Sequence, residues 1–444
     1  MEDFNGKYKK PFNYIASHYQ FRFNVVTSFY EFRTLEYVKG KKSKINTPWK
    51  KYDDRVKNLI LLKLMEMDMD IPQDKFNIFI ESELVSRDYN PFFEYFENLE
   101  PWDGKIDYIE QISKTVKTAD PEHFRSTLQR FFVGTVDCLL EEDAVNDVCL
   151  VFQSGQGIGK TRWMRSLLPE KFQAEYLYEG NIDTKNKDHT MYLSQYWFIH
   201  LDELETLKSN DISAIKSFIT RQRISVRKAF GRYKTNFIRR ASFLGSVNDD
   251  KFLTDITGNR RWLVFKVQNI DYEHAVDIDR MWAQVYSLWK DGYKHWFDID
   301  EIKIINKINE QFRSMSLEEE MLLQSASFET IEEGLGEFMT SADVLVKLGG
   351  ERAQLLNKLN ARNMGRALAK HSKAKKTKNG VAKYYLTWTG IDVALDTDLD
   401  YHEEDTSILN HEEFLEKKHL QEKTVREEAV KNRDAVVDDN EVPF

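Results

Sequence analysis

Cysteine is nearly absent from this chain, which has only Cys138 and Cys149 among its 444 residues. Neither lies in a CxxC pair or has a histidine at the spacing of a zinc site. These absences argue against a disulfide framework and a cysteine zinc cluster. We therefore expect both thiols to be reduced and buried in the core of a cytoplasmic protein.

Long apolar runs, a secretory signal and internal repeats are also missing. No stretch reaches the roughly 18 uncharged apolar residues that a membrane helix needs, so we expect no membrane span. The N-terminus lacks the basic and then apolar layout of a signal peptide. The 41% hydrophobic and 13% aromatic content is ample for packed domains, and the length favours two to four of them.

Acidic residues are concentrated at one end of the chain. Residues 396–444 contain 16 acidic and 6 basic residues and so carry a net charge of −10, whereas the whole chain carries −9. The remaining residues 1–395 therefore carry +1. This asymmetry predicts a nearly neutral body that can meet a polyanion, followed by a largely disordered acidic tail over 396–444.

The spacing of apolar residues predicts four regions before this tail. Helical spacing over 49–67 and 91–112 predicts a helical N-terminal region, 1–115. Strand-length runs alternating with helical segments predict an α/β domain over 116–299. Connecting helices follow over 300–339. Three helices and a basic hairpin with an Asn379-Gly380 turn predict a winged helix over 340–395.

A glycine-rich segment follows the apolar run at 147–152 and precedes a predicted helix over 160–168. Its sequence is Ser154-Gly155-Gln156-Gly157-Ile158-Gly159-Lys160-Thr161. This matches GxxxxGK[ST] except for serine in the first position, which is small enough to be tolerated. The backbone N–H groups would cradle a triphosphate, Lys160 would reach its β- and γ-phosphates, and Thr161 would ligate Mg²⁺. The segment therefore predicts that ATP and Mg²⁺ bind here.

Three further segments predict hydrolysis rather than binding alone. An apolar strand over 196–201 delivers Asp202 and Glu203, which would hold the Mg²⁺ shell and activate the attacking water. Asn248 ends the strand over 242–247, as the sensor 1 amide of AAA+ ATPases does. Arg260 and Arg261 are candidates for an arginine finger supplied across a subunit boundary, with ordinary surface charge as the alternative.

Together these motifs resemble the virulence-associated protein E family, a phage and mobile-element branch related to superfamily-three helicases. The resemblance covers 91–267 and includes the order and spacing of the P-loop, Leu201-Asp202-Glu203-Leu204, Lys216-Ser217-Phe218 and Thr257-Gly258-Asn259-Arg260-Arg261-Trp262. It implies an AAA+ P-loop motor that forms a homo-oligomeric ring, a hexamer, in replication of a mobile element. Two departures stand out: no primase carboxylate set precedes the motor, and Ala229-Phe230 replaces a more usual Pro-Tyr-like pair.

Basic residues alternate with apolar and aromatic ones over 221–234. The resemblance places a hairpin here that grips single-stranded DNA in the ring channel. Lys228, Arg232 and Lys234 would contact phosphates, although a solvated strand edge is the alternative. Basic residues in the predicted winged helix would contact duplex DNA, again with a solvated surface as the alternative.

The acidic tail ends in Pro443-Phe444, which looks like the terminus of bacterial single-stranded-DNA-binding proteins. It would dock on host replication proteins through these two residues, act as an inert solubilising tail, or mimic DNA. The sequence as a whole predicts an ATP-dependent DNA helicase or translocase. The alternatives are a DNA-binding initiator or remodelling switch, and a nucleotide-dependent scaffold.

Overall fold

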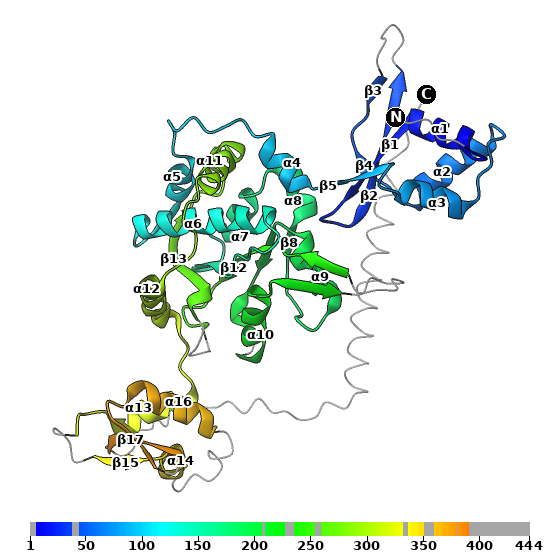
Figure 1. The fold of residues 1–444 in the computed structure, drawn as a ribbon. Helices are drawn as coiled ribbons and strands as arrows, with labels where there is room; N and C mark the ends of the chain where they lie inside the picture. The colour runs from blue at the N-terminus through cyan, green and yellow to red at the C-terminus, as the bar shows by residue number, and fades with distance from the viewer. Residues whose placement is uncertain are drawn as a thin grey trace, which may run out of the picture. The chain divides into compact units, whose positions relative to one another are not determined.

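The fold is that of a computed structural model describing residues 6–37, 44–206, 209–226, 235–253, 259–331, 336–349, 359–378 and 380–389 (Figure 1). The chain divides into two compact units. One comprises Met1–Glu320 and Leu359–Lys370, and the other comprises Met321–Lys358 and His371–Phe444. No helix in the described ranges has the length and apolar character of a membrane crossing. The predicted acidic tail lies outside the described residues.

The prediction of a helical N-terminal region was wrong, because this region contains a five-stranded sheet. Its strands are β1 (Tyr19–Asn24), β2 (Phe29–Tyr37), β3 (Lys44–Asn46), β4 (Lys50–Lys51) and β5 (Ser86–Tyr89). The order is β3-β2-β1-β5, with β4 also paired to β2. The reason lies in β1, where Tyr19, Phe21 and Phe23 alternate with polar residues, a period of two that suits a sheet with one covered face.

Three helices cover one face of this sheet: α1 (Lys9–His18), α2 (Asp54–Met65) and α3 (Gln73–Glu81). Ile15, Ile60 and Phe76 from these helices share a buried cluster with Tyr19 and Phe21 of β1. The helix predicted over 49–67 begins later, because the Asp53 side chain caps it by accepting from the backbone N of Val56.

The predicted helix over 91–112 is two short helices, α4 (Pro91–Glu97) and α5 (Tyr108–Lys114), separated by a turn. Asn90 caps α4 by accepting from two backbone N–H groups, and Pro91 stands at its first helical position. Asp107 caps α5 by accepting from the backbone N of Glu110.

The next region is built on a six-stranded sheet, which confirms a mixed α/β fold with parallel strands. The strands are β6 (Val116–Thr118), β7 (Cys149–Gln153), β8 (Leu177–Glu179), β9 (Phe198–Leu201), β12 (Ser242–Val247) and β13 (Trp262–Ile270). Their order is β6-β13-β7-β12-β9-β8, and all neighbours are parallel except β6 and β13. Strand β12 therefore lies between β7 and β9, and the ends of all three strands meet at one edge.

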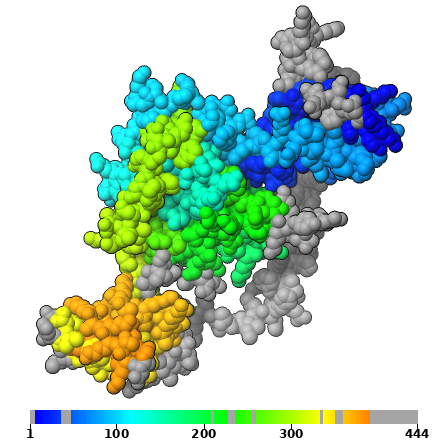
Figure 2. Space-filling model, in the orientation of Figure 1, coloured from blue at the N-terminus to red at the C-terminus, as the bar shows by residue number. Residues whose placement is uncertain are grey.

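Helices pack on both faces of this sheet and form a three-layer structure. They are α6 (Pro121–Leu140), α7 (Lys160–Ser166), α8 (Glu170–Tyr176), α9 (Lys187–Gln195), α10 (Ser209–Ile219), α11 (Ile278–Lys290) and α12 (Ile299–Asn309). Alternate residues of β7 enter different cores: Leu150 and Phe152 join one buried cluster, Cys149 and Val151 the other. Figure 2 shows this region, cyan to yellow-green, as a closed surface.

Cys138 and Cys149 are both buried and unpaired, as predicted from their apolar surroundings. Burial raises the pKa of each thiol, because the thiolate would lose its hydration. Both therefore act as core residues.

A two-stranded antiparallel sheet, β10 (Arg223–Val226) and β11 (Thr235–Ile238), flanks the predicted DNA-gripping segment. Residues 227–234 between these strands lie outside the described residues.

The C-terminal elements are α13 (Leu317–Ser325), β14 (Ala326–Ser327), β15 (Glu337–Met339), α14 (Ser341–Gly349), α16 (Ala361–His371), β16 (Lys375–Lys378) and β17 (Val381–Trp388). Strands β16 and β17 form the predicted hairpin, which closes beside Gly380 at a φ of 77°. Strand β15 pairs with the same β17. Residues 350–358, between α14 and α16, lie outside the described residues, so the three predicted helices and the winged helix stay a prediction.

Candidate active site

The glycine-rich segment forms the turn between β7 and α7. Gly157 and Gly159 adopt φ values of 88° and 95°, which favour glycine because a side chain would clash with the backbone. Gly159 also occupies the N-cap position of α7. The helix N-terminus and the turn before it present backbone N–H groups, an arrangement that suits anions.

A cavity of about 430 Å³ opens at this turn. Most of the residues predicted for the site line it, together with Arg162 and Tyr272, which were not predicted: Gln156, Gly157, Ile158, Gly159, Lys160, Thr161, Arg162, Asp202, Glu203, Asn248 and Tyr272. The structure thus brings together residues from four separate segments of the sequence.

Lys160 is 8% exposed, and its ammonium is held by oxygens without a formal charge. Its Nζ donates to the carbonyl oxygens of Ser154 at 2.9 Å and Gly155 at 3.1 Å, and to Asn248 Oδ1 at 2.9 Å. The Ser154 hydroxyl also accepts at 3.1 Å, so serine in the first motif position contacts the motif lysine. Burial lowers the pKa of Lys160, while the nearby carboxylates of Glu205 and Asp202 oppose that shift.

Asp202 and Glu203 follow the end of β9. Asp202 Oδ1 accepts a hydrogen bond from the Ser246 hydroxyl and one from the backbone N of Glu203 at 3.1 Å. Glu203 adopts a φ of 52°, in the left-handed region that costs a side-chain-bearing residue conformational energy. Its side chain is exposed on the cavity wall, where a carboxylate can meet water.

The orientation of Asn248 depends on Glu205, a residue that the sequence analysis missed. Glu205 Oε1 accepts from the Asn248 backbone N at 3.1 Å and from its Nδ2 at 2.8 Å. The amide oxygen is thereby turned toward Lys160. Glu205 Oε2 is buried and has no hydrogen-bond partner among the described residues. The available signal was a third acidic residue two positions after Glu203.

A buried histidine contacts Asp202 indirectly, through the Ser246 hydroxyl. His200 in β9 is 1% exposed, and its Nε2 lies 3.2 Å from the Ser246 hydroxyl oxygen. Burial lowers the pKa of His200, although Asp202 and Glu179 oppose this shift. Because Ser246 uses its proton on Asp202, a neutral His200 must carry its proton on Nε2.

Tyr272 gives a second reason for glycine at position 159. A Cβ at this position would lie 2.1 Å from Tyr272 Cδ1, well inside contact distance. The guanidinium of Arg162 lies 5.1 Å from the centre of the same ring. Tyr272 therefore packs directly on the turn and closes one side of the cavity.

Arg260 and Arg261 do not line this cavity in the described part of the chain. They lie in the short 3-10 helix η2 (Asn259–Arg261), where Arg260 is exposed. The buried Lys216 donates to Asn259 Oδ1 at 3.0 Å, and Asn309 Nδ2 donates to the Asn259 carbonyl at 2.7 Å. Lys216, which belongs to the Lys216-Ser217-Phe218 motif, thus anchors the turn that carries both arginines.

The other predicted contacts fall on undescribed parts of the chain. Lys228, Arg232 and Lys234, predicted to bind DNA, lie outside the described residues. So do Pro443 and Phe444, predicted to bind a partner.

Comparison with known proteins gives a family match and a structural likeness. Residues 96–314 match the family described as "Virulence-associated protein E-like domain", which confirms the resemblance seen in the motifs. No curated protein matches. The chain is similar to the apo structure of the NrS-1 C-terminal region (305–718), at 12% identity, 86% coverage of this chain, 99% of that one, and a TM-score of 0.40. It is also similar to the A-form apo structure of that region, at 12% identity, with 85% of this chain and 98% of that chain covered and a TM-score of 0.39.

Proposed function

From the premise that residues 96–314 of this chain are a virulence-associated protein E-like domain, we propose that the chain is a P-loop ATPase of the AAA+, superfamily-three-like type. It uses ATP hydrolysis to translocate on or unwind DNA in the replication of a phage or mobile element.

One observation carries the proposal: the hydrogen bond of 2.9 Å between Lys160 Nζ and Asn248 Oδ1. A lysine beside the phosphate-binding turn and an amide at the end of a neighbouring strand meet at the same cavity as Asp202 and Glu203. A protein that only binds nucleotide needs the lysine. The amide and the exposed carboxylate support hydrolysis as well.

The residues around the turn fit a nucleoside triphosphate with its magnesium ion. The neutral oxygens that now hold Lys160 can be exchanged for phosphate oxygens, which would pair with its charge. Thr161 and Asp202 offer two oxygens, and Mg²⁺ commonly uses few protein ligands with phosphates and waters completing the shell. The bound metal would neutralise charge that develops on the phosphates.

Each side chain then has a role in hydrolysis. Glu203 orients the attacking water and takes its proton, while Asn248 contacts the γ-phosphate or that water. Arg260 and Arg261, outside the cavity of their own subunit, would reach the site of a neighbouring one in a homo-oligomeric ring, a hexamer.

DNA would be held in two places. The antiparallel β10–β11 pair supports a hairpin that carries Lys228, Arg232 and Lys234 into the ring channel. The order α14, α16 and hairpin β16–β17, with β15 paired to β17, supports a C-terminal winged helix that contacts duplex DNA. The tail residues Pro443 and Phe444 would recruit host replication proteins.

The alternative is an ATP-dependent DNA-binding switch or scaffold without processive unwinding. It is favoured by the place of Arg260 and Arg261 away from the cavity, since the site stays incomplete in any chain that lacks a ring neighbour.

Steady-state ATP hydrolysis with and without single-stranded DNA tests the proposal, with Glu203→Gln as the matched variant. Strong stimulation by DNA that the substitution abolishes would support a motor and justify a strand-displacement assay. Hydrolysis indifferent to DNA would favour the switch or scaffold, and no hydrolysis under any condition would refute the ATPase.

A further inference from the structure

The sheet of the N-terminal region has two different faces. Helices α1, α2 and α3 cover one of them. The pairing register places the side chains that point to the other face, because paired residues share a face. Besides Gln20, Asn24 and the carboxylate of Glu31, that face carries basic and aromatic residues: Arg22, Phe29, Arg33, Lys51, Arg87 and Tyr89.

Three of these residues, Arg22, Arg33 and Tyr89, form a linked series of cation–ring contacts with Trp49. The guanidinium of Arg22 lies 3.4 Å from the centre of the Tyr89 ring and 4.3 Å from that of Trp49. Arg33 lies 4.4 Å from the same Trp49 ring. Such contacts hold the guanidinium planes in place. The series Tyr89–Arg22–Trp49–Arg33 therefore presents pre-oriented cations above the sheet.

The positive charges of Arg33, at one end of this series, and of Arg87 on the same face are not neutralised by a carboxylate within the described residues. Arg22 is paired with Glu31 at 2.6 Å and Glu94 at 3.5 Å. The Arg33 side chain has one hydrogen bond within the described residues, from its Nε to Gln20 Oε1 at 2.7 Å. The exposed Arg87 side chain has no ion pair or hydrogen bond with any described residue. The free positive charge thus lies away from Arg22.

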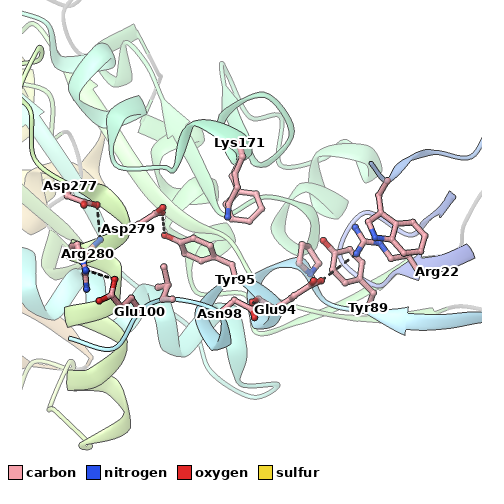
Figure 3. A pocket seen from close by; sticks show the side chains of 14 residues that line it. Arg22, Tyr89, Glu94, Tyr95, Asn98, Glu100, Lys171, Asp277, Asp279 and Arg280 are labelled. Carbon is pink, nitrogen blue, oxygen red and sulfur yellow. Dashed lines mark hydrogen bonds and ion pairs between the residues drawn. The ribbon is translucent and has the colours of Figure 1, made fainter. Parts of the chain in front are cut away.

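The inner end of the series meets the nucleotide-binding region. Arg22, Tyr89 and Trp49 line a cavity of about 510 Å³ together with residues of α4, α8 and α11 (Figure 3). Carboxylates line it as well: Glu94 lies beside Arg22, and Glu100, Asp277 and Asp279 lie toward the other end, where Arg280 pairs with Glu100 (Figure 3). They would repel phosphates, so a polyanion on this face is confined to the sheet side.

We propose that this sheet face is a binding surface for single-stranded DNA, separate from the predicted channel hairpin. Arg33, Arg87 and Lys51 would contact phosphates. An unpaired base would stack on the Arg33 guanidinium or on the Phe29 ring, which is 47% exposed. A duplex buries the faces of its bases and cannot use these stacking partners. The surface would hold the strand beside the motor when no nucleotide is bound.

Equilibrium binding of a fluorescent oligothymidylate to the full chain, without nucleotide, tests this surface. The test variant is Arg33→Glu with Arg87→Glu. The control is Arg55→Glu with Lys75→Glu, on α2 and α3 at the helix-covered face. Both variants change the net charge equally, so long-range attraction is matched. We expect the dissociation constant to rise about 10-fold or more in the first and less than about 2-fold in the second.

Two further readouts make the outcomes distinct. Loss of two phosphate contacts should lower the slope of log affinity against log salt by about 1.4. Equal weakening by both variants would reduce the effect to bulk charge, and no weakening by the first variant would remove the surface; either result overturns the proposal. Circular dichroism, and the neutral pair Arg33→Ala with Arg87→Ala, separate contact loss from misfolding. Because no ATP is present, the outcome is independent of whether the chain hydrolyses ATP.

Discussion

At the scale of single residues, the orientation of one amide decides what the candidate site can do. Asn248 could turn either its oxygen or its nitrogen toward Lys160. Glu205 accepts from both N–H groups of Asn248 on a single oxygen, which leaves the amide oxygen for Lys160. In the proposed ATP complex, phosphate oxygens would replace this oxygen at Lys160, while Glu205 would keep the amide in place.

Glu205→Ala should therefore slow ATP hydrolysis while nucleotide affinity changes little. We expect a loss of about 10- to 100-fold, below the cost of removing a catalytic donor outright, because Asn248 itself remains. Glu205→Gln keeps an acceptor oxygen and should restore much of the rate. Steady-state hydrolysis and titration with a fluorescent ATP analogue measure both quantities. A drop in affinity as large as that of Lys160→Ala would instead show that Glu205 only maintains the shape of the site.

His200 should make stability depend on pH. Burial lowers its pKa in the folded state below the unfolded value of about 6.5. The unfolded chain therefore binds the proton more readily. The stabilising effect is complete above pH 6.5 and is lost as pH falls toward the folded pKa.

Chemical denaturation between pH 7.5 and 5 measures this contribution. His200→Gln retains a group that can donate to the Ser246 hydroxyl but does not titrate in this range. Its stability should fall less over this interval than that of the unaltered chain. His274, whose pKa burial also lowers, is present in both proteins and cancels in the comparison. Parallel pH profiles would show that His200 does not titrate differently on folding.

How much of the site could be predicted depends on whether a residue acts on the ligand or on another residue. Lys160, Asp202 and Glu203 stand in motifs whose spacing reflects phosphate and metal geometry, and the cavity contains them. Glu205 and Ser246 act through side chains from other segments. Such contacts arise from strand order, which no local pattern encodes.

At the scale of elements, predictions were good where the signal is local. Helix α6 begins on local signals, because Pro121 stands at its first turn and the Asp120 side chain caps it. Strand β5 was missed because Ser86–Tyr89 is polar and pairs with β1, which lies more than sixty residues earlier. Its strand character comes from that partner. The alternation of Tyr19, Phe21 and Phe23 in β1 was a local strand signal, but the prediction for this region used only the helical spacing further along the chain.

The N-terminal sheet is joined to the region of the six-stranded sheet by a buried hydrogen bond. Asn24 Nδ2 donates to the Tyr176 hydroxyl at 3.0 Å. Tyr176→Phe should lower the free energy of unfolding by about 1 kcal/mol, the usual value of such a bond. A larger loss is not expected, since the same nitrogen still donates to Glu31. Tyr178→Phe, whose hydroxyl bonds to the Asn181 carbonyl in an exposed position, is the control and should cost much less. Equal losses would remove any special role for the Asn24 contact.

At the scale of the whole molecule, the proposed ring explains why the arginines are built as they are. Arg260 is exposed, and the turn that carries it is held by a hydrogen bond from the buried Lys216 to Asn259. Burying a lysine ammonium costs free energy, which is a high cost if the turn only presents an ordinary surface charge. The anchor is reasonable if the turn must present arginine to the site of a neighbouring subunit.

Mixing two inactive variants tests whether each site is shared. Lys160→Ala disables the phosphate site but keeps the arginines, and Arg260→Ala with Arg261→Ala does the reverse. Each should hydrolyse ATP poorly alone. When they are dissociated, mixed in equal amounts and reassembled, an interface is complete if an arginine-deficient subunit receives arginines from a Lys160→Ala neighbour. Random assembly makes about a quarter of the interfaces in a closed ring complete, so about a quarter of the original rate should return.

Full activity of the arginine variant alone would remove both arginines from catalysis. Mixed rings would be verified by their mass. If they stay inactive, each subunit supplies its own arginines, and the argument for a ring fails.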